Sequence, residues 1–332
     1  MFREVTTFSV LVDIYRGMPV LYAAYTGYDE IAHHFGADSK EAFRALRGID
    51  KQIRQIDRMQ QIYHQRRYDL YVLSDHGMSP SVPFRQLYQQ TLHAFLAEHV
   101  DRRLDVGQER GEGEGLLQAW VEFVLDEIDG LEARSPSTLS AQLLQATRRQ
   151  LKDSLKKESP SVEWDMNRRS DIEVRSSGSL SHIYLNVTTR QLDIGEIVLF
   201  YPSLLEALVN HDGIGLVVGH EADQVVILGK LGTLRIGHGV QHLTGKNPFL
   251  GLSDPDWAAR QVARLARFPH SGDLILFGRW DGDRVVSFEE QAASHGGLGG
   301  PASRPALLGP AGLGKSFAQV VRVPGGKPGV QQ

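Results

Sequence analysis

Cysteine is absent from the 332 residues of this chain. The chain therefore forms no disulfide bonds, holds no metal ion through thiolates and uses no cysteine nucleophile. Any metal ion that it binds must be coordinated by histidine nitrogens and carboxylate oxygens. The formal net charge is only -4, so the sequence also lacks the strong positive field that attracts nucleic acid.

The sequence contains no apolar run of about 18 residues, the length that a membrane-spanning helix needs. Its N-terminal segment is interrupted by Glu4 and Asp13, and no small-residue cleavage site follows, so we predict no signal peptide. We predict a cytoplasmic location for this chain and leave open a membrane attachment of a longer parent protein.

The first hundred residues show the periodicities of an α/β protein. Apolar side chains at positions 5, 8, 11 and 14 predict an N-terminal amphipathic helix, and the apolar run 18–25 is typical of a buried parallel strand. Asp38 or Ser39 is expected to cap a long helix that extends to about residue 66, and residues 69–73 predict a second strand. This order predicts a right-handed βαβ unit.

The remaining sequence divides into segments of different character. Residues 101–165 begin charged and glycine-rich and continue with helical stretches, which predicts a solvated insertion. We then expect a strand at 178–187, a helix at 194–210, paired strands at 214–218 and 225–228, and an apolar strand at 274–277. The residues after Pro324 are rich in glycine and predict a disordered tail.

Acidic and histidine side chains follow the predicted strands. Asp29 and His33 are four residues apart, so a helical turn places both on one face, where they can bind one ion. Asp75 and His76 are adjacent in a loop, and the glycine after them lets the backbone pass where a side chain would crowd the site. His295 lies far away in sequence in a similar glycine-rich loop. Ligands in open α/β sheets bind at the carboxyl ends of strands.

The segments YDEIAHHFG, LSDHGM and SHGG, in this order, resemble the alkaline phosphatase superfamily, and within it the type I phosphodiesterase/nucleotide pyrophosphatase family. The resemblance implies that Asp29, His33 and His295 hold one zinc ion. It implies that Asp75 and His76 hold a second zinc ion. In such sites two ions about 4 Å apart clamp a phosphoryl group.

The resemblance also implies the fold, a three-layer α/β/α sandwich with a mostly parallel sheet. Residues 1–100 would form the first part of a metallohydrolase core, 101–165 a charged helical insertion and 166–250 a small α+β subdomain. Residues 251–323 would complete the core with the last metal-binding histidine, and residues 324–332 would form the disordered tail.

The chain departs from the family pattern before the first motif. Relatives carry there a further aspartate for the second metal ion and the Thr or Ser nucleophile, but only 28 residues precede Asp29. Thr6 and Thr7 fall in the predicted N-terminal helix, so we assign neither as the nucleophile. We therefore expect an N-terminally truncated relative with one complete and one partial zinc site.

Several functions share these ligands. A phosphodiesterase or nucleotide pyrophosphatase acting on a small phosphate ester or nucleotide is the first hypothesis. A phosphomonoesterase or a metal-dependent phosphomutase is the second, and a non-catalytic metal-binding remnant is the third. Residues 309–316 (GPAGLGKS) also fit the phosphate-loop pattern. Only 16 residues follow, which leaves no room for a nucleoside triphosphatase domain, so we interpret this segment as a surface loop.

Overall fold

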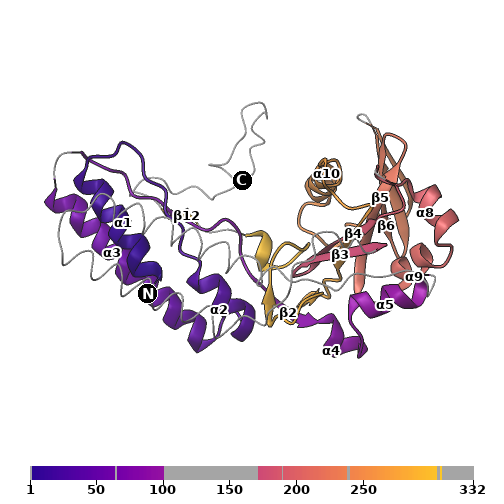
Figure 1. The fold of residues 1–332 in the computed structure, drawn as a ribbon, viewed down its shortest axis with the longest axis horizontal. Helices are drawn as coiled ribbons and strands as arrows, with labels where there is room; N and C mark the ends of the chain where they lie inside the picture. Colours follow the sequence, from indigo (N-terminus) through magenta and orange to yellow (C-terminus); the bar gives the residue numbers. More distant parts are fainter. Residues whose placement is uncertain are drawn as a thin grey trace.

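The computed structural model describes residues 2–63, 66–100, 171–188, 190–237, 240–304 and 307–308. Three α-helices at the N-terminus lie at one end of the described structure, and a large sheet lies at the other (Figure 1). We call residues 2–62 the helical arm and the described residues between 79 and 304 the sheet body. The expected insertion at 101–165, the phosphate-loop pattern at 309–316 and the tail at 324–332 lie outside the described residues.

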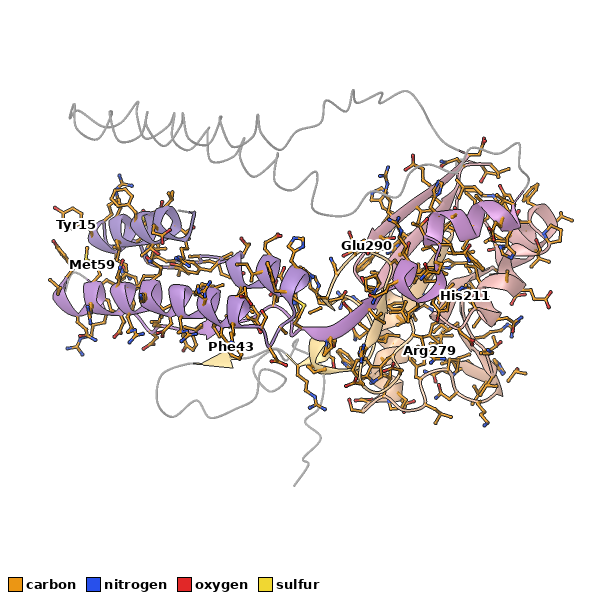
Figure 2. The ribbon with its side chains drawn as sticks, turned by 90° about the horizontal axis from the view of Figure 1, so that it is seen from below. Tyr15, Phe43, Met59, His211, Arg279 and Glu290 are labelled. Atoms are coloured by element: carbon orange, nitrogen blue, oxygen red, sulfur yellow. The ribbon has the colours of Figure 1, made fainter. Side chains whose placement is uncertain are left out.

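The helical arm consists of α1 (Phe2–Tyr15), α2 (Gly27–Phe35) and α3 (Lys40–Ile62). The helix predicted at the N-terminus and the long helix after residue 38 are both confirmed, and the Ser39 hydroxyl caps α3 by accepting the N–H of Ala42 at 3.0 Å. Helices α1 and α3 run side by side in the same direction, so Tyr15 and Met59 lie together at the end far from the sheet (Figure 2).

The buried face of α3 contains small side chains, whereas some of its large apolar side chains are exposed. Ala42, Ala45 and Ile56 are buried, whereas Phe43 and Leu46 are roughly half exposed. Small side chains at the contact let two helix backbones approach closely, and this outweighs the tendency to bury the larger residues. The arm thus keeps several large apolar side chains on its surface.

The predicted βαβ unit is wrong for the described residues. Residues 18–25 form no strand, and Val20 and Tyr22 are more than 80% exposed. The second predicted strand shrinks to β1 (Val72–Leu73), which pairs antiparallel with β12 (Leu307–Leu308). A parallel strand is stabilised by neighbouring strands and by helices on both faces. Within the described ranges these two segments do not pair with each other, so their apolar residues stay exposed.

The sheet body is built around seven antiparallel strands in the order β3-β4-β9-β5-β6-β7-β8. Their bounds are β3 (Ile172–Ser177), β4 (Leu180–Leu185), β5 (Ile214–Glu221), β6 (Gln224–Gly229), β7 (Gly232–Ile236), β8 (Gln241–Gly245) and β9 (Leu274–Gly278). The strands predicted at 178–187, 214–218, 225–228 and 274–277 are confirmed. Strand β9 lies between β4 and β5, so the segments 166–250 and 251–323, expected to be separate, share one sheet.

Alternation along the strands gives this sheet two buried faces. In β9, Leu274 and Leu276 face one apolar cluster, whereas Ile275 and Phe277 face another. Helices α4 (Phe84–Tyr88), α5 (Leu92–His99), α8 (Ile194–Phe200) and α9 (Leu204–Asn210) cover the first face, and α10 (Pro255–Ala266) covers the second. The helix predicted at 194–210 is two helices, α8 and α9, because Pro202 lacks the N–H that would continue it.

The body also contains a three-stranded sheet, which contacts α2 of the arm. It has the order β10-β2-β11, with β2 (Ser79–Pro83), β10 (Val285–Ser287) and β11 (Ala293–Ser294). The β2–β10 pair is parallel and β2–β11 is antiparallel. A 3₁₀ helix, η1 (Pro301–Ser303), follows.

The described structure is therefore mixed α/β, and its body has helices on both faces of a sheet, but the expectation of a mostly parallel sheet is wrong. Periodicity shows which residues are buried and does not determine the direction of strands that pair across long sequence distances. Among the described residues, no helix combines the length and the apolar character needed to cross a membrane.

Candidate metal centre

Helix α2 carries the first two candidate ligands. Asp29 lies in its first turn and His33 in its last turn, so the four-residue spacing places both side chains on one face of the helix. The helix ends at Gly36, whose φ of +93° favours glycine and whose N–H donates to the carbonyl of Ala32 at 2.8 Å. The local sequence alone thus places two of the three candidate ligands on one face of a helix.

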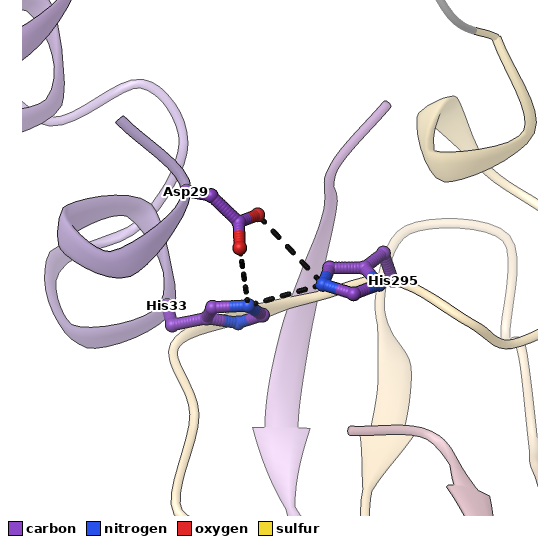
Figure 3. A group of neighbouring side chains, drawn as sticks. All are labelled: Asp29, His33 and His295. Carbon is purple, nitrogen blue, oxygen red and sulfur yellow. Dashed lines mark hydrogen bonds and ion pairs between the residues drawn. The ribbon is translucent and has the colours of Figure 1, made fainter. Parts of the chain in front are cut away.

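Strand β11 brings the third candidate ligand from 262 residues away. Ala293 and Ser294 pair with Pro80 and Ser79 of β2, and His295 follows directly. Figure 3 shows its imidazole facing the two α2 side chains. The Nε2 atom of His295 lies 3.2 Å from Nε2 of His33 and 3.7 Å from Oδ1 of Asp29.

The spacing of the donor atoms of these three residues fits one small cation. The other carboxylate oxygen of Asp29, Oδ2, lies 3.4 Å from Nε2 of His33. A tetrahedral zinc ion with ligand bonds of about 2.0–2.1 Å requires ligand atoms about 3.3 Å apart. Oδ1 of Asp29 is also buried without a hydrogen-bond partner, which costs free energy unless a cation or proton lies beside it. Asp29, His33 and His295 can therefore hold a metal ion.

A backbone contact orients the His33 ring. Its Nδ1 lies 2.8 Å from the carbonyl oxygen of Ala293, and a carbonyl can only accept, so Nδ1 carries the hydrogen. In the neutral ring this leaves the lone pair on Nε2, the atom that faces Asp29 and His295. Such outer contacts are typical of metal-binding histidines, because they fix both the ring and its tautomer. The sequence could not indicate this acceptor, since every residue has a carbonyl.

Asp29 and His33 each stabilise the charged form of the other. Burial raises the pKa of Asp29, but the hydrogen bond with His33 and the nearby His33, His295 and His76 rings together bring that pKa below its usual value. Burial lowers the pKa of His33, and its contacts with Asp29 and the Ala293 carbonyl outweigh this and raise that pKa. The centre thus contains a stabilised carboxylate, the form that binds metal ions.

Asp75 and His76 lie beside this cluster and are not part of it. The His76 ring stacks on His295 with 3.7 Å between ring centroids. The Asp75 side chain is 83% exposed, and its Oδ1 lies 3.6 Å from Nε2 of His76. The same oxygen accepts the backbone N–H of His76 at 3.1 Å. The structure thus brings together three of the five predicted ligands and places the other two next to them.

Close packing explains the glycine after this pair. A Cβ atom on Gly77 would lie 2.1 Å from the carbonyl oxygen of Pro301 in η1, and the Gly77 N–H donates to the Ala302 carbonyl at 2.9 Å. The loop that carries His76 therefore rests directly on the backbone of η1. A side chain here would therefore collide with the backbone of η1, whereas the expected crowding was at the metal site.

Comparison with known proteins gives one finding. The family model described as type I phosphodiesterase/nucleotide pyrophosphatase matches residues 5–188, more than half of the chain. The match contains Asp29, His33, Asp75 and His76, whereas His295 lies beyond it. No curated protein and no solved structure matches the chain.

Proposed function

Because the chain belongs to the type I phosphodiesterase/nucleotide pyrophosphatase family, within the alkaline phosphatase superfamily, we propose that it is a metal-dependent phosphoester hydrolase. The observation that supports this most is the convergence of Asp29, His33 and His295. His295 lies outside the region matched by the family, so its position beside the other two is independent support.

We propose zinc as the ion at this cluster. Two imidazoles and one carboxylate form a donor set used by catalytic zinc sites, which keep a further position open for water or substrate. A bound zinc ion polarises a phosphoryl oxygen and lowers the pKa of bound water. The residues contribute orientation and charge. The Ala293 carbonyl holds the His33 ring, and the Asp29 carboxylate beside it would offset the positive charge of a bound ion.

Asp75 and His76 are our proposed ligands for a second zinc ion. Their donor atoms lie 3.6 Å apart, a spacing that two ligands of one ion can adopt, and the His76 ring contacts His295 of the first cluster. Two ligands leave such a site partial, and the exposure of Asp75 gives solvent access to it. The proposed substrate is a small phosphate ester or nucleotide, with diesters and nucleotide pyrophosphates favoured by the family.

We assign no nucleophile among the described residues. The hydroxyl of Thr7 donates to the carbonyl of Arg3 at 2.7 Å and lies 2.8 Å from the Tyr25 hydroxyl, so it takes part in the packing of α1. With no nucleophile assigned among the described residues, we expect slow turnover.

A second candidate function is a metal-binding module without turnover. It is favoured by the exposure of the Asp75 side chain. It is also favoured by the exposure of residues 20 and 22, which were expected to lie in a buried parallel strand. A phosphomonoesterase or phosphomutase would use the same ligands, and the described residues do not distinguish the leaving group.

The experiment measures zinc content and the hydrolysis of bis(4-nitrophenyl) phosphate and 4-nitrophenyl phosphate. We expect one tightly bound zinc ion, slow zinc-dependent cleavage of the diester, and loss of both in His33→Ala. His34→Ala is the matched control, because His34 is the next residue on α2 and its side chain is exposed. Zinc binding without cleavage of either ester would favour the non-catalytic module. A chain that retains no zinc would refute the metal centre.

A further inference from the structure

The loop that carries His295 is held by few strand contacts. Strand β11 pairs with β2 at two positions only, and Ser294 is the last of them. The next residues are His295 and Gly296, and Gly296 has a φ of +79°, a conformation that glycine adopts readily. Strand pairing therefore ends just before the residue whose position decides whether three ligand atoms converge.

Two buried hydroxyl groups bond to the backbone of this residue instead. The Ser179 hydroxyl donates to the carbonyl of His295 at 3.3 Å, and the Ser294 hydroxyl donates to the same oxygen at 3.2 Å. Both serines are fully buried. A carbonyl oxygen has two lone pairs, so two donors occupy both and restrict the rotation of the peptide group.

The turn that carries Ser179 is itself firmly anchored. It joins β3 to β4, and its two carbonyls accept hydrogen bonds from outside the hairpin: Ser179 from the N–H of Gly278 and Gly178 from the N–H of Phe288, both at 2.8 Å. The N–H of Gly178 donates to the carboxylate of Glu289. The turn is thus tied to β9 and to the segment after β10.

Two glycines allow the turn and the loop to approach each other. A Cβ atom on Gly297 would lie 2.1 Å from the Ser179 hydroxyl oxygen, and a Cβ atom on Gly178 would lie 2.1 Å from the Ser294 hydroxyl oxygen. Any larger residue at either position would separate the hydroxyls from the His295 carbonyl.

We propose that Ser179, together with Ser294, is a positioning residue that fixes His295 for metal binding. This inference rests on the proposed metal centre and adds that the β3–β4 turn controls its affinity. The hydroxyls act through the backbone of His295, whose imidazole lies 3.2 Å from His33 Nε2 and 3.7 Å from Asp29 Oδ1. Loss of either hydroxyl should let the loop relax and move the His295 imidazole away from His33 and Asp29.

The test compares Ser179→Ala with Ser181→Ala in the full chain. Ser181 is equally buried and lies two residues further along, but its hydroxyl contacts Ser176 and the carbonyl of Arg175 and not His295. The readouts are zinc affinity, from competition with a chromophoric chelator, and the visible spectrum of the Co²⁺-substituted protein. A general loss of stability would affect both variants, whereas the Co²⁺ spectrum reports the geometry of the ligands.

We expect Ser179→Ala to weaken zinc binding about 10-fold, at the lower end of the effect of removing outer contacts of metal ligands, and to change the Co²⁺ spectrum. Ser181→Ala should leave both as in the wild type. If Ser179→Ala does not fold, Ser294→Ala is judged by the same criterion. Equal zinc affinity and equal spectra in the Ser179 and Ser181 variants would overturn the inference and leave the metal centre intact. Absence of zinc binding in the wild type would overturn both.

Discussion

The proposed ion would join the helical arm to the sheet body, because Asp29 and His33 belong to α2 and His295 follows β11. Two hydrogen bonds already link these elements: the N–H of Ala292 donates to the His33 carbonyl at 2.7 Å, and His33 Nδ1 donates to the Ala293 carbonyl at 2.8 Å. At about 0.5–1.5 kcal/mol each, they contribute about 1–3 kcal/mol to the contact.

Zinc at 100 times its Kd stabilises the bound state by about 2.7 kcal/mol, as much as both hydrogen bonds together. If exchange of the Ala292 amide hydrogen requires α2 to separate from β11, saturating zinc should slow this exchange about 100-fold. Hydrogen exchange followed by NMR or mass spectrometry measures it. Amides of the β5–β6 pair, far from the centre in sequence, serve as the internal reference.

The variant His295→Ala separates this effect from nonspecific zinc binding. It keeps both hydrogen bonds between α2 and β11 and removes the ligand contributed by the body, so zinc should no longer slow exchange at Ala292. His34→Ala should respond to zinc as the wild type does. Equal slowing in His295→Ala and the wild type, or no slowing in the wild type at saturating zinc, would refute the reasoning.

Three further predictions concern stability. Gly77→Ala should cost about 1–3 kcal/mol in urea unfolding, because its Cβ would lie 2.1 Å from the Pro301 carbonyl oxygen; an unchanged midpoint would contradict the packing of the His76 loop on η1. Phe84→Ala, at a residue 1% exposed in the body core, should cost about 3–5 kcal/mol, whereas Phe8→Ala, at a residue 60% exposed, should stay within about 0.5 kcal/mol. Burial lowers the pKa of His182, whose Nδ1 accepts the N–H of Gly272 at 3.0 Å. The folded state therefore favours the neutral ring, and it loses stability as the pH falls below the usual histidine pKa of 6.5. His182→Asn, which keeps an acceptor, should unfold with a flatter pH dependence between pH 7 and 5, and an unchanged slope would refute this assignment.

Local regularities in the sequence determined the parts of this protein that need no distant partner. The four-residue spacing of Asp29 and His33 places both on one face of a helix wherever α2 lies, and Ser39 caps α3 as its residue type suggests. The apolar run at 274–277 predicted a strand, and the motif order identified the family before any geometry was known. These features depend on neighbours within a few positions, so the sequence carries them directly.

Tertiary structure decided everything that depends on which distant segments meet. The apolar run 18–25 reads as a strand, yet it stays exposed because no strand of the described residues pairs with it. The position of His295 beside α2 follows from the pairing of β11 with β2, more than 200 residues apart, and from the hydroxyls that hold its carbonyl. The place of β9 between β4 and β5 likewise depends on pairing across long sequence distances, whereas β5 and β6 are joined by a short turn. Periodicity indicates which side chains are buried, whereas the packing of the whole chain determines which segments cover them.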